Sequence, residues 1–286
     1  NGFEVLQQIK ADEELRHLPV VMVSALTEID SVVRCIALGA EDYLTKPFNP
    51  ILLRARVGAC MEKKRLRDRE VMHLREIEQE RQRADDLLHV IFPAQIVHEL
   101  KTTAKVKPQY YENVAVLFCD VVEFTPYCER SDPEEVIANL QELIGAYEEV
   151  VLQHNMEKIK TIGDSFMATA GLLKRVDNPA VNGVECGLRM VEIANSLPTK
   201  WKVRVGVHLG SVVAGVVGNR QYLFDLWGDT VNTASRIESH GAEGHVNVSS
   251  AVWEALQDRF HATPRGQVLV KGKGEMDLYQ ILGRKS

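Results

Sequence analysis

The sequence predicts an α/β segment, then a long charged helix, then an α+β domain. Residues 1–60 alternate helical and strand patterns around the apolar run 19–25, which is typical of a parallel strand buried on both faces. Residues 61–86 carry both charge signs and contain no glycine or proline, which favours a solvated helix. From residue 113 onward, strand and helix patterns follow in the order βαββαβ.

Composition narrows the class of protein. The 286 residues are 45% apolar with a formal net charge of -6, which is typical of a soluble globular protein of roughly two domains. The acidic balance argues against a nucleic-acid partner. No apolar stretch approaches the roughly 20 residues of a membrane span, so we expect no membrane span and a cytoplasmic protein. The five cysteines form no C-x-x-C pair, which implies neither a disulfide framework nor a zinc site.

The first segment reads as the second half of an α/β sheet. The expected elements are a helix at 3–9, a strand at 19–25, a helix at 32–38 closed by Gly39, a strand at 42–45 and a helix at 50–59.

These residues resemble the receiver domain of response regulators, a flavodoxin-like fold. The match comprises N-G-F-E-V-L, Ser24 at the end of a strand, G-A-E-D-Y-L-T at 39–45, and Lys46 before a proline. The resemblance implies that Lys46 contacts a phosphoryl group, that Ser24 switches with it, and that the Lys-Pro bond is cis. The alternative is that both are ordinary surface and strand-end residues.

The family's phosphoacceptor aspartate lies upstream of residue 1. We therefore expect missing upstream sequence, no phosphorylation of this segment by itself, and a receiver input with a sensor kinase as partner in the full-length protein.

Residues 61–92 form the expected helical linker between a partial receiver, 1–60, and a catalytic domain, 93–286. Apolar residues along one face of this helix follow alternating spacings of three and four, which forms a seam that Arg81 interrupts. The seam residues are Leu74, Ile77, Ala84, Leu88 and Ile91. The helix either pairs with its copy in a second chain or is a single solvated connector. Pro93 marks its end.

The second half predicts a ferredoxin-like sheet with helices on one face. Its expected elements are a strand at 114–119, a helix at 133–154, a hairpin at 157–170, a helix at 178–196 and a strand at 201–208. Asp132 is the expected N-cap of the first helix, with Pro133 at its first position and Glu135 completing a capping box. A strand at 212–217, a helix at 230–239 and a hairpin around 271–274 follow.

Two aspartates predict a metal site. Asp120 ends the apolar run 114–119, and Asp164 lies in a two-residue turn after Gly163. Carboxylates from adjacent strands could bind two Mg²⁺ ions, whose other ligands are water and phosphate oxygens. The turn at 121–126 could offer backbone N–H groups to phosphate. Taken alone, each aspartate is more often a cap or turn residue.

Asn232 and Arg236 project from one face of a helix because they are four residues apart. An amide and a guanidinium so placed could hold a ribose and a phosphate. Taken alone, such a pair is more often a solvated helix face.

Residues 113–286 resemble the catalytic domain of class III nucleotidyl cyclases, specifically adenylyl cyclases. The matching motifs, in order, are F-C-D-V-V-E-F-T, E-K-I-K-T-I-G-D-S-F-M-A, V-R-V-G-V-H-L-G, F-D-L-W-G-D-T-V-N-T-A-S-R-I-E and V-K-G-K-G. In that family two domains pair head to tail, and each active site draws residues from both. One chain here carries all these motifs, so the resemblance implies a homodimer with two equivalent sites.

The resemblance also assigns roles to residues. Asp120 and Asp164 match ligands of two Mg²⁺ or Mn²⁺ ions, assisted by the Val121 carbonyl. Asn232 orients the ribose, and Arg236 stabilises the transition state. The remaining matches are Lys160 and Asp225 as readers of adenine, Phe124 and Thr125 in the phosphate turn, and Lys271 and Lys273 as triphosphate contacts.

The purine pair implies ATP as substrate. Lysine donates and aspartate accepts, which complements the ring nitrogen and amino group of adenine, whereas guanine has a carbonyl in place of the amino group. Guanylyl cyclases of this family have a glutamate where Lys160 stands. Heterodimeric relatives have an arginine soon after the glycine that corresponds to Gly210. This chain has Ser211 there, so more of the contact to the phosphates is left to Lys271 and Lys273.

The expected reaction is in-line attack of the ribose 3′-oxygen on the α-phosphorus, with pyrophosphate leaving. The alternatives are a catalytically silent nucleotide-binding or dimerisation module, or a guanylyl cyclase. A diguanylate cyclase would carry a G-G-D/E-E-F signature, which is absent.

Overall fold

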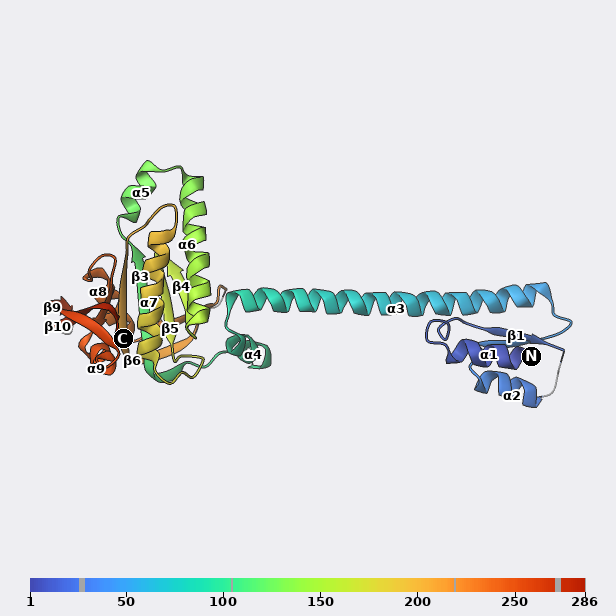
Figure 1. The fold of residues 1–286 in the computed structure, drawn as a ribbon. Helices are drawn as coiled ribbons and strands as arrows, with labels where there is room; N and C mark the ends of the chain where they lie inside the picture. Colours follow the sequence, from blue (N-terminus) through green and yellow to red (C-terminus); the bar gives the residue numbers. More distant parts are fainter. Residues whose placement is uncertain (26–28, 104, 219, 271–273, 286) are drawn as a thin grey trace. The chain divides into compact units, whose positions relative to one another are not determined.

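The computed structural model describes residues 1–25, 29–103, 105–218, 220–270 and 274–285. It divides into two compact units, residues 1–91 and 92–286 (Figure 1). Among the helices of the described residues, none combines the length and the apolar character needed to cross a membrane.

The first unit contains the predicted parallel strand pair. Its elements are α1 (Gly2–Ala11), β1 (Val21–Ser24), α2 (Ile29–Ala37), β2 (Asp42–Thr45) and α3 (Pro50–Ile91). The two strands are parallel, with Val21 opposite Asp42 and Ser24 opposite Thr45. Leu6 and Cys35 are buried in a small core between the helices and this sheet. The α/β prediction is confirmed, and the Lys46-Pro47 peptide bond is cis.

Helix α3 joins two segments that the sequence suggested as separate. It runs without a break from the expected helix at 50–59 through the linker. Gly58 does not interrupt it, because a glycine inside a helix costs only about 1 kcal/mol relative to alanine. The helix ends two residues before Pro93. The seam residues Leu74, Ile77 and Ile91 are exposed, so pairing with a second chain stays a prediction.

The second unit begins with the βαββαβ core. After α4 (Ala94–Thr103) its elements are β3 (Gln109–Val121), α5 (Phe124–Arg130), α6 (Pro133–Gln153), β4 (Glu157–Ile162), β5 (Ser165–Ala170), α7 (Pro179–Ser196) and β6 (Val203–Val217). The strand order is β4-β5-β3-β6 with every pair antiparallel, which confirms the ferredoxin-like arrangement.

Local signals placed the ends of these elements. Asp132 caps α6 by accepting a hydrogen bond from the Glu134 amide at 2.9 Å, and Pro133 is the first helical residue. The bond comes from the Glu134 amide and not from the Glu135 amide, so Asp132 is a simple cap, which corrects the expected capping box. Gly163 adopts φ 64° in the turn between β4 and β5, a conformation that glycine adopts without strain.

Strand β6 is longer than predicted. It unites the expected strands at 201–208 and 212–217, because Leu209 and Gly210 stay paired with β3. The later elements are β7 (Leu223–Trp227), α8 (Asp229–Ser239), β8 (Val246–Ser249), α9 (Ser250–Leu256), β9 (Phe260–Val270) and β10 (Gly274–Arg284). The short elements α4, β7, β8 and α9 were not predicted. Strands β9 and β10 form the expected last hairpin.

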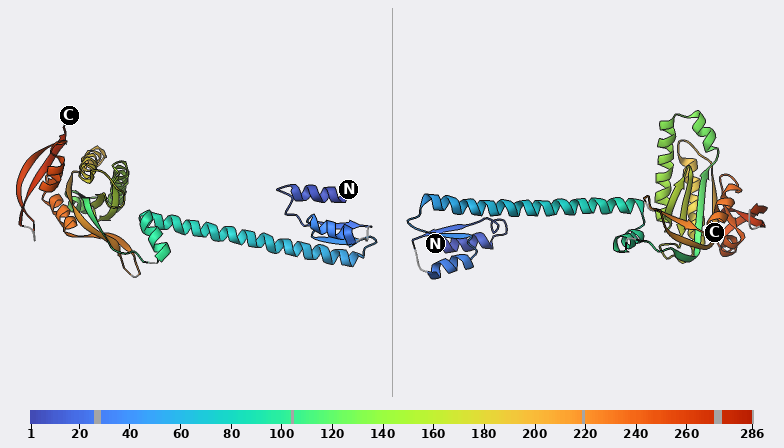
Figure 2. Two further views of the ribbon diagram at one scale, coloured as in Figure 1. Left: turned by 90° about the horizontal axis from the view of Figure 1, so that it is seen from below. Right: turned by 180° about the vertical axis from the view of Figure 1, so that it is seen from behind.

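The sheet carries helices on both faces, which corrects the prediction of one covered face. Helices α6 and α7 lie side by side on one face (Figure 2), where Gly183 of α7 approaches Val207. Successive side chains of a strand point to opposite faces. Accordingly, Gly206 and Gly210 of β6 face α8 on the other side. The prediction missed this layer because α8 follows the βαββαβ core in sequence.

Candidate functional site

The structure brings the two predicted metal-binding carboxylates together. Cys119 of β3 lies opposite Phe166 of β5, so Asp120 sits beside the turn that holds Asp164. Asp120 is half-buried, and burial raises the pKa of its carboxyl to about 6. The Asp164 charge contributes to this rise, whereas the Arg204 charge opposes it.

This pair fits a hard divalent cation. Two neighbouring carboxylates concentrate negative charge, and a cation relieves their repulsion. Among the described residues no cluster of three or more His, Cys, Asp or Glu side chains could hold a metal ion. Two carboxylates suit Mg²⁺ or Mn²⁺, because Mg²⁺ keeps several waters and takes substrate phosphates as ligands. Val121, whose carbonyl is the further expected ligand, is the buried last residue of β3.

Lys160 and Asp225 form an ion pair although 65 residues separate them. Lys160 Nζ lies 2.5 Å from Asp225 Oδ2, and the two side chains are 26% and 12% exposed. The other oxygen, Asp225 Oδ1, accepts from the Leu226 amide at 2.8 Å, which fixes the carboxylate. The pair forms because β4 and β7 lie close together. The ion pair therefore places a hydrogen-bond donor, the Lys160 ammonium, next to an oriented acceptor, the Asp225 carboxylate.

Helix α8 carries Asn232 and Arg236 one turn apart. Asn232 is exposed and Arg236 is half-buried. The start of the helix is held to β6 by Thr230, whose hydroxyl donates to the Ser211 carbonyl at 2.6 Å. Gly210 makes this approach possible, because a β-carbon there would lie 2.5 Å from the Thr230 hydroxyl oxygen.

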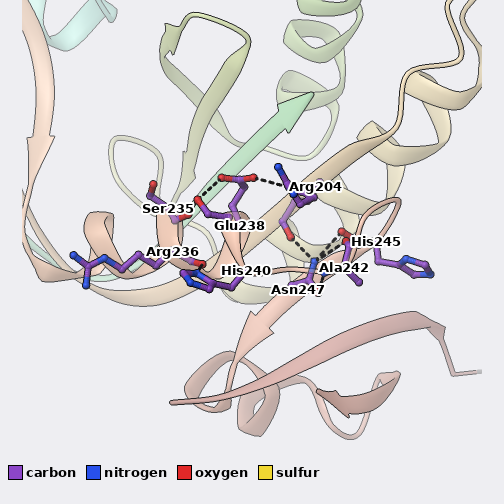
Figure 3. Close-up of polar contacts among 10 residues, drawn as sticks. Arg204, Ser235, Arg236, Glu238, His240, Ala242, His245 and Asn247 are labelled. Atoms are coloured by element: carbon purple, nitrogen blue, oxygen red, sulfur yellow. Dashed lines mark hydrogen bonds and ion pairs between the residues drawn. The ribbon is translucent and has the colours of Figure 1, made fainter. Parts of the chain in front are cut away.

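The end of α8 is held as closely. A β-carbon on Gly206 would lie 2.2 Å from the Glu238 backbone nitrogen. Figure 3 shows the Glu238 side chain turned toward Arg204, while Arg236 extends away from that pair. The two glycines of the V-R-V-G-V-H-L-G motif thus let α8 pack closely on β6, which sets the position of Asn232 and Arg236 relative to the sheet.

The predicted phosphate turn is the start of the short helix α5. Glu123 precedes it in a left-handed conformation, φ 57°. The Phe124 ring packs edge-on against Trp201 at 6.3 Å, so this side chain anchors the turn. Thr125 is exposed in the first helical turn. Lys271 and Lys273 lie outside the described residues.

The two receiver residues are neighbours in the first unit. Ser24 ends β1, and the Lys46 amide donates to the Ser24 carbonyl at 2.8 Å. Their roles as switch residues stay a prediction.

Sequence reasoning missed two charged residues beside Asp120. Arg204 lies directly opposite Asp120 in the pairing of β3 with β6. Glu238 is 5% exposed, and burial raises the pKa of its carboxyl to about 7; the Asp120 charge adds to the rise, and Ser239 and Arg204 oppose it. The sequence did contain a signal for both residues. Arg204 is a charged residue inside the apolar strand pattern V-R-V, and Glu238 is an acidic residue that directly follows Ile237 on the buried side of a helix.

Comparison with known families agrees with this arrangement. Residues 106–283 match the adenylate and guanylate cyclase catalytic domain, and residues 1–58 match the response regulator receiver domain. An adenylate cyclase of Mycobacterium tuberculosis (strain ATCC 25618 / H37Rv) is 37% identical over 214 residues, 73% of this chain and 48% of the relative. The receptor-type guanylate cyclase gcy-13 of Caenorhabditis elegans is 35% identical over 230 residues, 77% of this chain and 22% of the relative. The chain thus spans about half or less of the length of these relatives.

A solved structure shows the same fold. The guanylate cyclase domain of RhGC from Catenaria anguillulae, in complex with GTP, superposes with a TM-score of 0.60 at 32% identity, covering 62% of this chain and 100% of that domain. The relatives include both adenylate and guanylate cyclases, and catalytic domains of this kind are generally metal-dependent. With its sheet, its carboxylate pair and these matches, the chain belongs to the class III adenylate and guanylate cyclase family, with a receiver domain preceding the catalytic domain.

Proposed function

We propose that the chain is an adenylyl cyclase that converts ATP to 3′,5′-cyclic AMP and pyrophosphate. The observation that carries this proposal is the Lys160–Asp225 ion pair. The ammonium can donate to the adenine ring nitrogen, and the carboxylate can accept from the adenine amino group. Guanine presents an N–H to the lysine and a carbonyl to the aspartate. A site that depends on such hydrogen bonds can discriminate by roughly 10⁴-fold.

The residues of the chain support in-line displacement at the α-phosphorus. The bond from the ribose 3′-oxygen to the α-phosphorus forms, the bond from that phosphorus to the bridging oxygen breaks, and the 3′-hydroxyl proton passes to water. Asp120, Asp164 and the Val121 carbonyl would hold two Mg²⁺ or Mn²⁺ ions, which supply activation of the 3′-hydroxyl and charge neutralisation when bound.

The other site residues bind and orient the substrate. Asn232 orients the ribose, and Arg236 neutralises charge that develops on the phosphorus, an effect of about 10²-fold or more in rate. The phosphate turn at Phe124 and Thr125, with Lys271 and Lys273, contacts the triphosphate.

The enzyme is proposed to act as a homodimer with two shared sites, under receiver input from a sensor kinase. Each site takes its metal-binding carboxylates from one chain and Lys160, Asp225, Asn232 and Arg236 from the other. Asp120→Ala and Arg236→Ala proteins are each expected to be inactive alone. Mixed in equal amounts, they should recover about a quarter of the wild-type rate, because half of the randomly formed dimers are mixed and each contains one intact site. A mixture as inactive as its parts would contradict shared sites.

The direct test is product formation by purified protein with ATP or GTP and Mg²⁺ or Mn²⁺. We expect metal-dependent cyclic AMP, its loss in Asp120→Ala, and its retention in Asp258→Ala, an exposed aspartate of the same unit. A preference for GTP would contradict the assigned purine. ATP binding without turnover would instead indicate a nucleotide-binding module.

A further inference from the structure

Three charged residues from three elements meet on the α8 face of the sheet. Asp120 ends β3, and Arg204 of β6 is its direct register partner. Glu238 reaches the same place from the last turn of α8. Arg204 also forms an ion pair with Glu238, with its Nε 3.5 Å from Glu238 Oε1. Arg204 therefore connects the metal-binding carboxylate with the helix that carries Asn232 and Arg236.

The contact between Arg204 and Glu238 is incompletely satisfied. Arg204 Nε lies 3.5 Å from Glu238 Oε1, and within the described part of the chain neither atom has a hydrogen-bond partner. Glu238 Oε2 accepts from the Ser239 hydroxyl at 3.1 Å (Figure 3). A buried ion pair of this kind adds little stability, because the cost of removing two charges from water offsets their attraction. A positioning role explains its presence better than a stabilising one.

The backbone around Glu238 is fixed. Its amide nitrogen packs against Gly206, where no side chain would fit. Beyond the helix, the buried side-chain amide of Asn247 donates to the carbonyls of Val205 and Ala242 at 3.2 Å and accepts from the Ala242 amide at 2.9 Å. This ties the loop after α8 to β6. Glu238 is therefore a rigid anchor for the Arg204 side chain.

We propose that Glu238 acts through Arg204 as a positioning residue that holds the Asp120 carboxylate in its metal-binding orientation. This rests on the proposed function in one respect, the assignment of Asp120 as a metal ligand. Partners that orient a ligand in this way commonly change metal affinity by about 10- to 100-fold when they are replaced.

The test measures metal binding directly as well as activity. Free Mn²⁺ is followed by electron paramagnetic resonance, and the Mn²⁺ concentration for half-maximal activity is measured in parallel. Glu238→Gln is expected to weaken Mn²⁺ binding by about tenfold or more, with the nucleotide KM at saturating metal changed less than about twofold. Glu243→Gln, an exposed glutamate five residues on, is the matched control. Arg204→Lys keeps the charge and loses the fork of donors, so it should weaken Mn²⁺ binding in the same direction.

Mixed dimers separate positioning of Asp120 from a general effect on α8. In the Asp120→Ala with Arg236→Ala mixture, the Arg236→Ala chain supplies the metal-binding carboxylates. Glu238→Gln placed in that chain should raise the Mn²⁺ requirement at least about fivefold more than in the other chain. Equal effects from both chains, or wild-type Mn²⁺ binding by Glu238→Gln, would overturn the proposal. A product other than cyclic AMP would contradict ATP as the substrate. It would not bear on the role of Glu238, which the Mn²⁺ binding measurement tests separately.

Discussion

Single residues of the candidate site are held by short, specific contacts. The Asp225 carboxylate is fixed on both oxygens, by Lys160 and by the Leu226 amide. Lys160 comes from an edge strand and keeps about a quarter of its side chain exposed. The pair thus combines a fixed acceptor with an accessible donor, so the choice of purine depends on these two side chains.

Reversing the polarity of this pair should reverse the purine preference. In Lys160→Glu with Asp225→Ser, the new carboxylate can accept from guanine N–H groups and the hydroxyl can donate to the guanine carbonyl. The ratio of ATP to GTP turnover, measured as kcat/KM for each nucleotide, should fall by about 100-fold or more. Lys158→Glu is the control, because this lysine lies on the same strand and pairs with Glu148 at the surface. An unchanged ratio in the double variant would refute the assigned role.

At the scale of elements, the contact between α8 and β6 positions Asn232 and Arg236. Two glycines four residues apart on β6 face two residues eight apart on α8, Thr230 and Glu238. Strand and helix rise at about 3.3 and 1.5 Å per residue, so both spans are close to 12–13 Å. The two elements therefore match in length over this contact.

Gly206→Ala should destabilise the second unit. Its β-carbon would meet the Glu238 backbone nitrogen and α-carbon at 2.2 and 2.6 Å, and backbone atoms cannot move aside as a side-chain end can. Overpacking of this kind costs about 1–3 kcal/mol or more of unfolding free energy. Gly145→Ala is the matched control in α6, where a β-carbon meets nothing within 4 Å.

The control should stabilise the protein by about 0.5–1 kcal/mol, because alanine favours the helix. Both are measured by chemical denaturation. Equal midpoints for the two variants would show that the α8 contact is looser than described.

At the scale of the whole molecule, two units fold around separate cores. The first contains the parallel strand pair, and the second contains the sheet with the candidate site. The long helix α3 is mostly exposed and strongly charged. The dimer proposed above requires a second copy of the second unit to complete each site.

Activity should therefore depend on protein concentration. If each site needs two chains, the rate per chain should fall once the protein is diluted below the dimer dissociation constant. Cyclic AMP formation is measured over a dilution series, with the mass of the species determined at each concentration. Full activity of a species with monomer mass would contradict shared sites.

Much of the fold follows from local pattern. The turn at Gly163, the cap at Asp132 and the helices expected at 133–154 and 178–196 each depend on neighbouring residues, so their positions were predicted to within one residue. Segments without a distinctive period were missed. Strand β7 is only five residues long, yet it carries Asp225. The length of β6 was missed because Gly210 resembles an interruption between two strands until β3 pairs alongside it.

The sequence by itself determined the order of the elements in the βαββαβ core, the family motifs and the residue types of the site. The site residues can be recognised from local sequence, since Asp120 is a carboxylate at a strand end and the amide of Asn232 lies four residues before the guanidinium of Arg236. Only the tertiary structure decided that Lys160 and Asp225 of one chain form an ion pair, that α8 covers the second face of the sheet, and that Arg204 lies between Asp120 and Glu238. These pairings join residues 30 to 120 positions apart, and the packing of the sheet, not local sequence, sets distances of that kind.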